Sequence, residues 1–221
     1  LDNGFKQMSA RRALRTPADY RGLRVRVQAS RVLGEQMRAL GAQPVVLPFG
    51  ETQRALASGV VDAAENPPSN FLTQGLAALQ PHLTLTQHGY LGYAVVTHPR
   101  FWESLSRVDR ALVDDALAEA LAHGNRLAEA LDRQALASLR QTPGLQVHVL
   151  GAAEREALRR HLRPVVDGFG RKLQGYAAVE GSTALGAFGD LAVTKGQIAA
   201  KASSTLGCGS GYGAWQRCST S

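Results

Sequence analysis

Apolar and polar residues alternate strictly in one short stretch near the start of the chain, residues 22–27 (GLRVRV). Its three apolar residues share one side and Arg24 and Arg26 share the other, which is the period of a β-strand with one packed and one charged face. The following residues, 31–40, have helical spacing and stop at Gly41. The pattern therefore predicts a strand that leads directly into a helix.

Strand and helix patterns continue to alternate over the next forty residues or so. Residues 44–48 and 60–64 are short apolar runs typical of buried strands, and residues 51–58 between them have the pattern of a short helix that ends at Gly59. A further helix is expected at 71–79. This alternation indicates an α/β domain with a partly parallel sheet.

A long helical pattern follows two more predicted strands at 83–86 and 92–97. Residues 107–140 carry an apolar stripe at helical spacing. A helix of this length runs roughly 50 Å, longer than a small domain is wide, so it should bridge two lobes or bend. A last strand at 146–150 and an amphipathic helix at 152–169 complete the pattern.

Two segments lack a sustained pattern. Residues 1–14 are polar and mixed, with a turn signal at residues 3–4 (NG). Residues 171–221 hold nine of the 23 glycines and ten Ser/Thr, so this tail is expected to pack poorly. Cys208 and Cys218 both lie in the tail, and two cysteines there decide nothing about the redox compartment.

The net charge of +7 raises nucleic acid or an anionic membrane surface as a partner. The excess is local, because residues 1–50 hold nine Lys/Arg against three Asp/Glu, whereas residues 51–170 hold eleven against thirteen. No Lys/Arg run is interleaved with aromatic residues, so no nucleic-acid partner is expected. No run of eighteen apolar residues predicts a membrane span. An anionic small ligand near residues 1–50 explains the charge more economically.

Motifs of catalysis and of metal or cofactor binding are absent from the sequence. The six histidines form no pair at two-, three- or four-residue spacing, and there is no nucleophile elbow, phosphate loop or dinucleotide fingerprint. No catalytic residue, metal or cofactor is therefore expected. An enzyme acting on acidic substrates stays an alternative, with Glu65 as the nearby candidate for a general base beside Arg26.

Residues 65–70 (ENPPSN) read as a loop directly after a strand, the place where open α/β sheets bind ligands. Arg26 on its strand and Asn66 beyond another could face one cleft, where the guanidinium offers a bidentate fork to a carboxylate and the amide holds the second oxygen. Asn70 supplies a second amide in the same loop, and Phe49 would form an apolar wall. The arrangement predicts a site for a small carboxylate.

Several short motifs follow one another in order through about residues 1–169. They are 2–7 (DNGFKQ), 15–19 (RTPAD), 22–27 (GLRVRV), 40–42 (LGA), 48–49 (PF), 59–62 (GVVD), 65–67 (ENP) and 87–90 (QHGY). Together they strongly resemble the solute-binding proteins of tripartite ATP-independent periplasmic (TRAP) transporters, of the C4-dicarboxylate type.

The resemblance implies an α/β, periplasmic solute-binding-protein-like fold of two lobes with a long bridging helix, one lobe being largely incomplete here. It implies Arg26 as the main salt-bridge partner of a substrate carboxylate, assisted by Lys6 and Asn66, with Phe49 as a wall. Relatives carry arginine at the place of Lys6, and a lysine offers a point charge rather than a fork. The predicted substrate-binding residues are Arg26, Asn66, Lys6, Phe49, Asn70 and Tyr90.

Four segments are expected from the pattern and the resemblance together. Residues 1–91 should form a ligand-binding lobe, and residues 92–140 a strand of the other lobe with the long lobe-spanning helix. Residues 141–170 should return to the first lobe as a strand and a helix, and residues 171–221 should form the glycine- and serine-rich tail.

The expected function is that of a non-catalytic extracytoplasmic receptor. It would capture a small organic mono- or dicarboxylate and deliver it to the membrane permease subunits of a secondary transporter, without spanning the membrane itself. A periplasmic location is expected, with a signal peptide upstream of residue 1. The alternatives are a truncated or frameshifted fragment without function, suggested by the change of composition at Arg171, and a basic module that binds nucleic acid or a membrane surface.

Overall fold

A six-stranded mixed sheet forms the centre of the computed structural model, which describes residues 1–174, with side chains through residue 169. The strand order is β3-β2-β4-β1-β5-β6. The strands are β1 (Asp2–Ala10), β2 (Arg24–Val27), β3 (Gln43–Val46), β4 (Ala63–Asn66), β5 (His82–Gly92) and β6 (Gln146–Val149). β2 is parallel to β3 and β4, and β5 is parallel to β6, whereas β1 is antiparallel to both of its neighbours. The predicted α/β class with a partly parallel sheet is confirmed.

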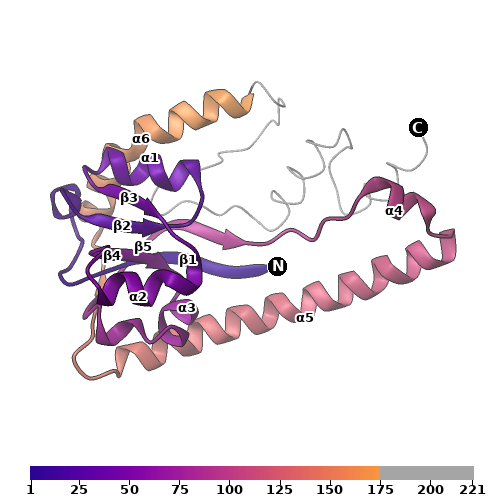
Figure 1. The fold of residues 1–221 in the computed structure, drawn as a ribbon, viewed down its shortest axis with the longest axis horizontal. Helices are drawn as coiled ribbons and strands as arrows, with labels where there is room; N and C mark the ends of the chain where they lie inside the picture. Colours follow the sequence, from indigo (N-terminus) through magenta and orange to yellow (C-terminus); the bar gives the residue numbers. More distant parts are fainter. Residues whose placement is uncertain (175–221) are drawn as a thin grey trace.

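Helices cover both faces of this sheet (Figure 1). One face carries α1 (Arg31–Ala39) and α6 (Ala152–Gln174), and the other carries α2 (Thr52–Ala57), α3 (Pro68–Thr73) and the C-terminal end of α5 (Arg107–Arg140). The shorter helices are η1 (Pro17–Tyr20), η2 (Phe49–Glu51), η3 (Leu76–Ala78) and α4 (Pro99–Ser104). Two buried apolar clusters, one under each helical layer, hold the sandwich together.

The strand and helix predicted around residues 22–40 are confirmed as β2 and α1. The Ser30 side chain accepts a hydrogen bond from the Leu33 amide and so caps α1. Gly41, just beyond the helix, has a φ of 76°, a left-handed conformation that glycine adopts without strain. The predicted charged face is not solvated throughout, because Arg26 is only 1% exposed.

The polar opening segment was expected to hold a turn at residues 3–4, and this prediction is wrong. Residues 2–10 form β1, an interior strand of the sheet that pairs with β4 on one side and β5 on the other. The register of β1 and β5 shifts between Asp2 and Gly4, and Gly4 has a φ of 101°. The turn signal therefore marks a bulge inside a strand rather than a turn.

Three strand boundaries also differ from the prediction. β4 begins at Ala63 rather than residue 60 and includes the polar Glu65 and Asn66. The strands expected at 83–86 and 92–97 are replaced by a single β5 that ends at Gly92 and continues through an irregularity at Gln87, whose φ is 50°. The 44–48 run is β3 at the sheet edge, with partly exposed residues, rather than a buried strand.

The long helix is confirmed at residues 107–140 as α5. Its C-terminal end packs against the sheet, where Ala135 and Leu139 are buried, and Asn125 near its middle accepts a hydrogen bond from the Asp2 N–H of β1 at 2.9 Å. The N-terminal half and α4 project away from the sheet (Figure 1), and Val108 and Leu112 on the apolar stripe remain 77% and 68% exposed. Within residues 1–174, no helix has the length and apolar character that a membrane span requires.

The predicted strand at 146–150 and helix at 152–169 are confirmed as β6 and α6. Helix α6 continues to Gln174, and the rest of the tail predicted for residues 171–221 lies outside the described residues, as do both cysteines. The segment boundaries predicted at residues 91, 140 and 170 stay predictions.

Candidate functional site

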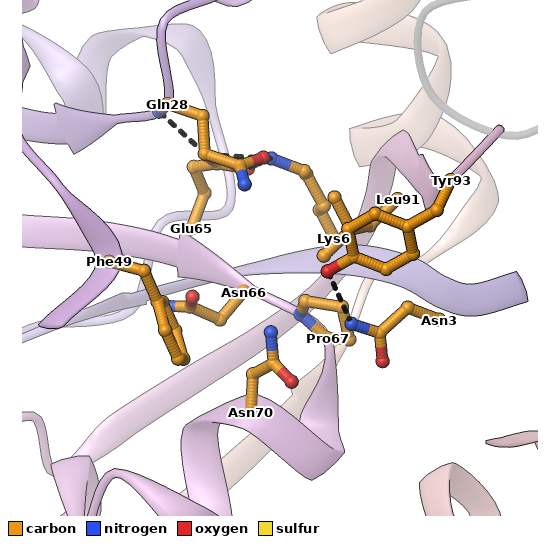
Figure 2. Close-up of a pocket in the computed structure, with 10 residues that line it drawn as sticks. All are labelled: Asn3, Lys6, Gln28, Phe49, Glu65, Asn66, Pro67, Asn70, Leu91 and Tyr93. Atoms are coloured by element: carbon orange, nitrogen blue, oxygen red, sulfur yellow. Dashed lines mark hydrogen bonds and ion pairs between the residues drawn. The ribbon is translucent and has the colours of Figure 1, made fainter. Parts of the chain in front are cut away.

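A cavity of ≈ 170 Å³ lies at the edge of the sheet where the parallel strands β2, β3 and β4 end (Figure 2). Gln28 directly follows β2, Phe49 opens the short helix after β3, and Glu65 and Asn66 are the last residues of β4. Because parallel strands place their carboxyl ends at one edge, these four side chains converge although they are far apart in the sequence. The prediction of a site beyond strand ends agrees with this cavity.

Glu65 and Asn66 are neighbours in β4, so their side chains point to opposite faces of the sheet. Figure 2 shows Glu65 on the side of Lys6 and Gln28, and Asn66 on the side of Phe49 and Asn70. The cavity thus has a charged side and an amide side. Both residues were expected in a loop, and their position in a strand holds them in one fixed orientation.

Lys6 and Glu65 form a buried ion pair on the charged side of the cavity. The Lys6 Nζ lies 2.9 Å from Glu65 Oε1 and 2.7 Å from Oε2, and it also donates to the Gln28 side chain. Burial lowers the pKa of Lys6 and raises that of Glu65, and the opposite charge of the partner counteracts each change. The short contact favours the ionised pair at neutral pH.

His88 on β5 packs behind this pair. Its ring is fully buried, its Nδ1 lies 2.7 Å from Thr86 Oγ1, and its Nε2 lies 3.9 Å from Glu65 Oε2. Burial, with the nearby charge of Lys6 as a smaller cause, lowers the pKa of His88 to about 3. His88 is therefore a neutral imidazole at pH 7.

This burial predicts acid destabilisation. Below pH ~6.5 His88 becomes protonated in the unfolded chain but stays neutral in the folded chain. Each pH unit below this value should therefore lower the free energy of unfolding by about 1.4 kcal/mol as the pH falls toward 5. Glu65 acts in the opposite direction, because its raised pKa in the folded state favours folding at low pH. Urea unfolding of the His88→Gln variant from pH 7 to 5 should show a shallower loss of stability than the wild type.

The exposed His123 provides the matched control for loss of an imidazole. His123→Gln should lose stability between pH 7 and 5 as the wild type does. If His88→Gln shows the same loss of stability as the wild type and His123→Gln, His88 does not resist protonation in the folded chain.

Arg26 lies beside the cavity without lining it. Its Nε and Nη2 donate to Leu47 O at 3.1 and 2.8 Å, and its Cζ lies 5.9 Å from the centre of the Phe49 ring. Its recorded hydrogen bonds within the described chain go to this one oxygen, so some of its five N–H groups keep no protein partner there. Burial lowers the pKa of Arg26, although a guanidinium stays charged at neutral pH.

Arg24, two residues earlier on the same strand, belongs to a different arrangement. Its Nε and Nη2 donate to the Asp62 carboxylate at 3.0 and 2.7 Å, and its backbone N–H donates to the same group. Its side chain is 43% exposed. The expectation that Arg24 is a solvated residue outside the binding site therefore agrees with its position, with Asp62 as its partner.

Asn66 offers a buried donor at the cavity. Its Nδ2 has no hydrogen-bond partner in the described part of the chain, and the residue is only 3% exposed. A buried amide donor without a partner is costly, so a ligand acceptor would satisfy it. Phe49, Asn66, Asn70 and Lys6, four of the residues predicted to bind substrate, line the cavity.

Tyr90, like Arg26, is a predicted residue that does not line the cavity. Its ring packs edge-on against Phe5 with centroids 5.1 Å apart. Six lining residues were not among the predicted binding residues, namely Asn3, Gln28, Glu65, Pro67, Leu91 and Tyr93. Asn3 Nδ2 donates to the Tyr93 hydroxyl at 3.3 Å. If residues 2–10 had been recognised as a strand, Asn3 could have been placed next to β5 and near the cavity.

Among the described residues, no group of three or more His, Cys, Asp or Glu side chains is arranged to hold a metal ion. The cavity instead combines a buried cationic edge, side-chain amides and one aromatic wall.

Known proteins are similar to this chain in sequence and in fold. Residues 1–172 match the bacterial extracellular solute-binding proteins of family 7. The chain is 42% identical to a C4-dicarboxylate-binding periplasmic protein DctP of Rhodobacter capsulatus over 185 residues, which cover 83% of this chain and 56% of that protein.

Two solved structures of TRAP periplasmic solute-binding proteins resemble the fold. One from Shewanella oneidensis with bound succinate has a TM-score of 0.75 and 37% identity, covering 78% of this chain and 57% of that one. Another from Pseudomonas aeruginosa with bound L-malate has a TM-score of 0.71 and 35% identity, covering 76% and 58%. The chain thus spans little more than half the length of these relatives.

Proposed function

Because the chain belongs to family 7 of the bacterial extracellular solute-binding proteins, we propose that it binds a small organic carboxylate as a receptor for transport. The observation that carries the proposal is the unpartnered Asn66 amide, buried at a cavity whose neighbouring cations are Lys6 and Arg26. A carboxylate would supply both the acceptor for the amide and the negative charge. The succinate and L-malate bound by the two solved relatives support this ligand class.

Each residue has a distinct part in the proposed site. Arg26 supplies the main positive charge and the N–H groups that Leu47 leaves unused, and Asn66 donates to the second carboxylate oxygen. Lys6 contributes an ammonium group at the other side of the cavity, where Glu65 offsets its charge. Phe49 excludes water from the guanidinium, and Asn70 offers further hydrogen bonds. Tyr90 acts indirectly: its packing against Phe5 holds the strand that also carries Leu91.

The receptor role extends beyond the described residues. We propose a periplasmic location and delivery of the carboxylate to the permease subunits of a TRAP transporter, in line with the names of the relatives. The family is one of solute-binding proteins, and Glu65, the candidate for a general base, is already engaged by Lys6. An enzymatic reaction has no comparable support.

Thermal unfolding with matched ligands tests the carboxylate proposal. Saturating succinate or L-malate should raise the unfolding temperature of the chain, since a ligand at a hundred times its Kd adds about 2.7 kcal/mol of stability. Succinamide, which replaces both carboxylates by neutral amides, should leave the temperature unchanged. Equal shifts with succinate and succinamide, or no shift with any carboxylate, would contradict the proposal.

Salt dependence separates the remaining alternative. A single carboxylate held in a partly buried site should lose little affinity between 50 and 200 mM salt, whereas a surface for nucleic acid or anionic membranes loses affinity steeply. Binding that collapses over this range would favour the basic surface module.

A further inference from the structure

Among the described residues, three charged side chains lie at or beside the cavity. Lys6 and Arg26 are cationic, Glu65 is anionic, and His88 behind them is neutral at pH 7. The other described residues that line the cavity carry amide, hydroxyl, aromatic or aliphatic side chains. This part of the site therefore holds one net positive charge, and Glu65 is the residue that reduces it from two.

Glu65 is placed to compete with a ligand for Lys6. Its carboxylate has no exposed surface and contacts the ammonium through both oxygens, at 2.9 and 2.7 Å. The Gln28 side-chain oxygen accepts from the same ammonium, and the Gln28 backbone N–H donates to Glu65 Oε1 at 3.4 Å. Two of the three ammonium donors are thereby occupied before any ligand enters.

Because of its position on β4, Glu65 contacts Lys6 on one side of the cavity only. Asn66, the next residue, faces the opposite side, where its amide has a free donor. The charge of Glu65 also reaches Arg26, but the hydrogen bonds of that guanidinium within the described residues go to Leu47 O rather than to Glu65. A first ligand carboxylate can therefore be matched by Arg26 and Asn66. A second carboxylate near Lys6 would meet the negative charge of Glu65 at close range.

We propose that Glu65 determines how many carboxylate groups this wall of the cavity accepts: by neutralising Lys6 it selects a ligand that presents one carboxylate here over one that presents two. The inference rests on the proposed function and specifies its ligand class. Desolvating a second carboxylate without a free cation is unfavourable, because a buried charge needs a partner.

The test compares two ligands that differ in a single group. Succinate carries two carboxylates, and succinamate has the same skeleton with one of them replaced by a neutral amide. Calorimetry at pH 7 on the complete chain gives the ratio of their affinities. In Glu65→Gln, which keeps the side-chain shape and frees the Lys6 charge, the succinate-to-succinamate ratio should rise by about tenfold or more over the wild type.

Two further variants control for the loss of the buried pair. Lys6→Met should lower the ratio below the wild type, because it removes a cation and leaves Glu65 in place. Lys6→Met combined with Glu65→Gln restores the wild-type net charge and should return the ratio to about the wild-type value. Replacing a buried ion pair by neutral residues of similar size is often tolerated, so the double variant is expected to fold.

The outcomes separate the two proposals. If succinamate and succinate bind but Glu65→Gln leaves their ratio unchanged, the role of Glu65 is wrong while carboxylate binding stands. If Glu65→Gln does not fold, the comparison is made in the Lys6→Met background. The succinate-to-succinamate affinity ratio must then be higher in the double variant than in Lys6→Met, and an unchanged ratio overturns the inference. If neither acid binds the wild type or any variant, the inference and the proposed function both fail.

Discussion

Arg26→Ala should reduce the affinity for a small carboxylate by about a hundredfold or more, the largest effect on binding expected for any single substitution in this chain. The guanidinium is 1% exposed, beside the cavity and against Phe49. A charge in such a place interacts strongly with a ligand carboxylate, because little water screens it. Isothermal titration calorimetry with succinate measures the loss.

Arg24→Ala is the matched control for this experiment. Arg24 lies two residues away on the same strand, but its guanidinium pairs with Asp62 and is 43% exposed. The control should leave succinate affinity within about twofold and change stability little, because solvent screens an exposed ion pair. Similar losses of affinity in both variants would show that the positive charge of β2 as a whole, rather than Arg26, holds the ligand.

Stability must be followed together with binding in the Arg26 variants. Alanine removes the two hydrogen bonds to Leu47 O, so some loss of stability is expected at this buried position. Arg26→Lys keeps the charge but not the planar fork and should bind more weakly than the wild type and more tightly than alanine. Circular dichroism of each variant confirms that it is folded at the temperature of the calorimetry.

Phe71→Ala should lower the unfolding free energy by about 3–5 kcal/mol, the largest effect expected on stability. The ring has no exposed surface and belongs to the buried cluster between the sheet and the helices α2, α3 and α5. Removing it leaves a cavity that the surrounding strands and helices can fill only in part. Urea unfolding monitored by circular dichroism measures the change.

Leu72→Ala, at the next position of α3, is the control for this prediction. Leu72 is 39% exposed, so its truncation should cost less than about 1 kcal/mol. Comparable losses at residues 71 and 72 would mean that α3 does not pack through Phe71. Since α3 also carries Asn70, and Asp132 of α5 accepts a hydrogen bond from the Ser69 N–H at 3.0 Å, the anchoring of α3 positions one wall of the cavity.

The sequence predicts elements well where a single face is buried. The strand β2, the helix α1 and the final β6–α6 pair follow from apolar periods that match one packed side. The helix α5 is predicted with its observed bounds because its stripe persists over the whole length.

Prediction fails where polar side chains are buried together. β1 contains the buried residues Lys6, Gln7 and Ser9, and β4 ends in the buried Glu65 and Asn66. A polar residue in an interior strand is tolerated because its partner lies on the neighbouring strand, as Glu65 does for Lys6. Such pairing is a property of the assembled sheet, and no local period reveals it.

The same reasoning applies to the candidate site, where the predicted binding residues stay predictions. Lys6, Phe49, Asn66 and Asn70 line the cavity, whereas Arg26 lies beside it and Tyr90 packs elsewhere. The resemblance supplied Lys6, Phe49 and Asn66, because residue types at motif positions transfer between relatives, and the loop pattern at residues 65–70 supplied Asn70. Tyr93, which does line the cavity, belongs to a segment that was expected to form a separate strand, and its approach to Asn3 depends on the pairing of the first strand with the fifth.

The one-sided anchoring of α5 has a mechanical consequence. With Asn125, Asp132, Ala135 and Leu139 anchoring its middle and its C-terminal end, the helix has an N-terminal arm of about 18 residues that is roughly 27 Å long. A rotation of about 10° at the anchored part would move the far tip by roughly 5 Å, since the rise per residue fixes the length of the arm. Small adjustments at α3, next to Asn70, would thus be magnified at the opposite end of the molecule.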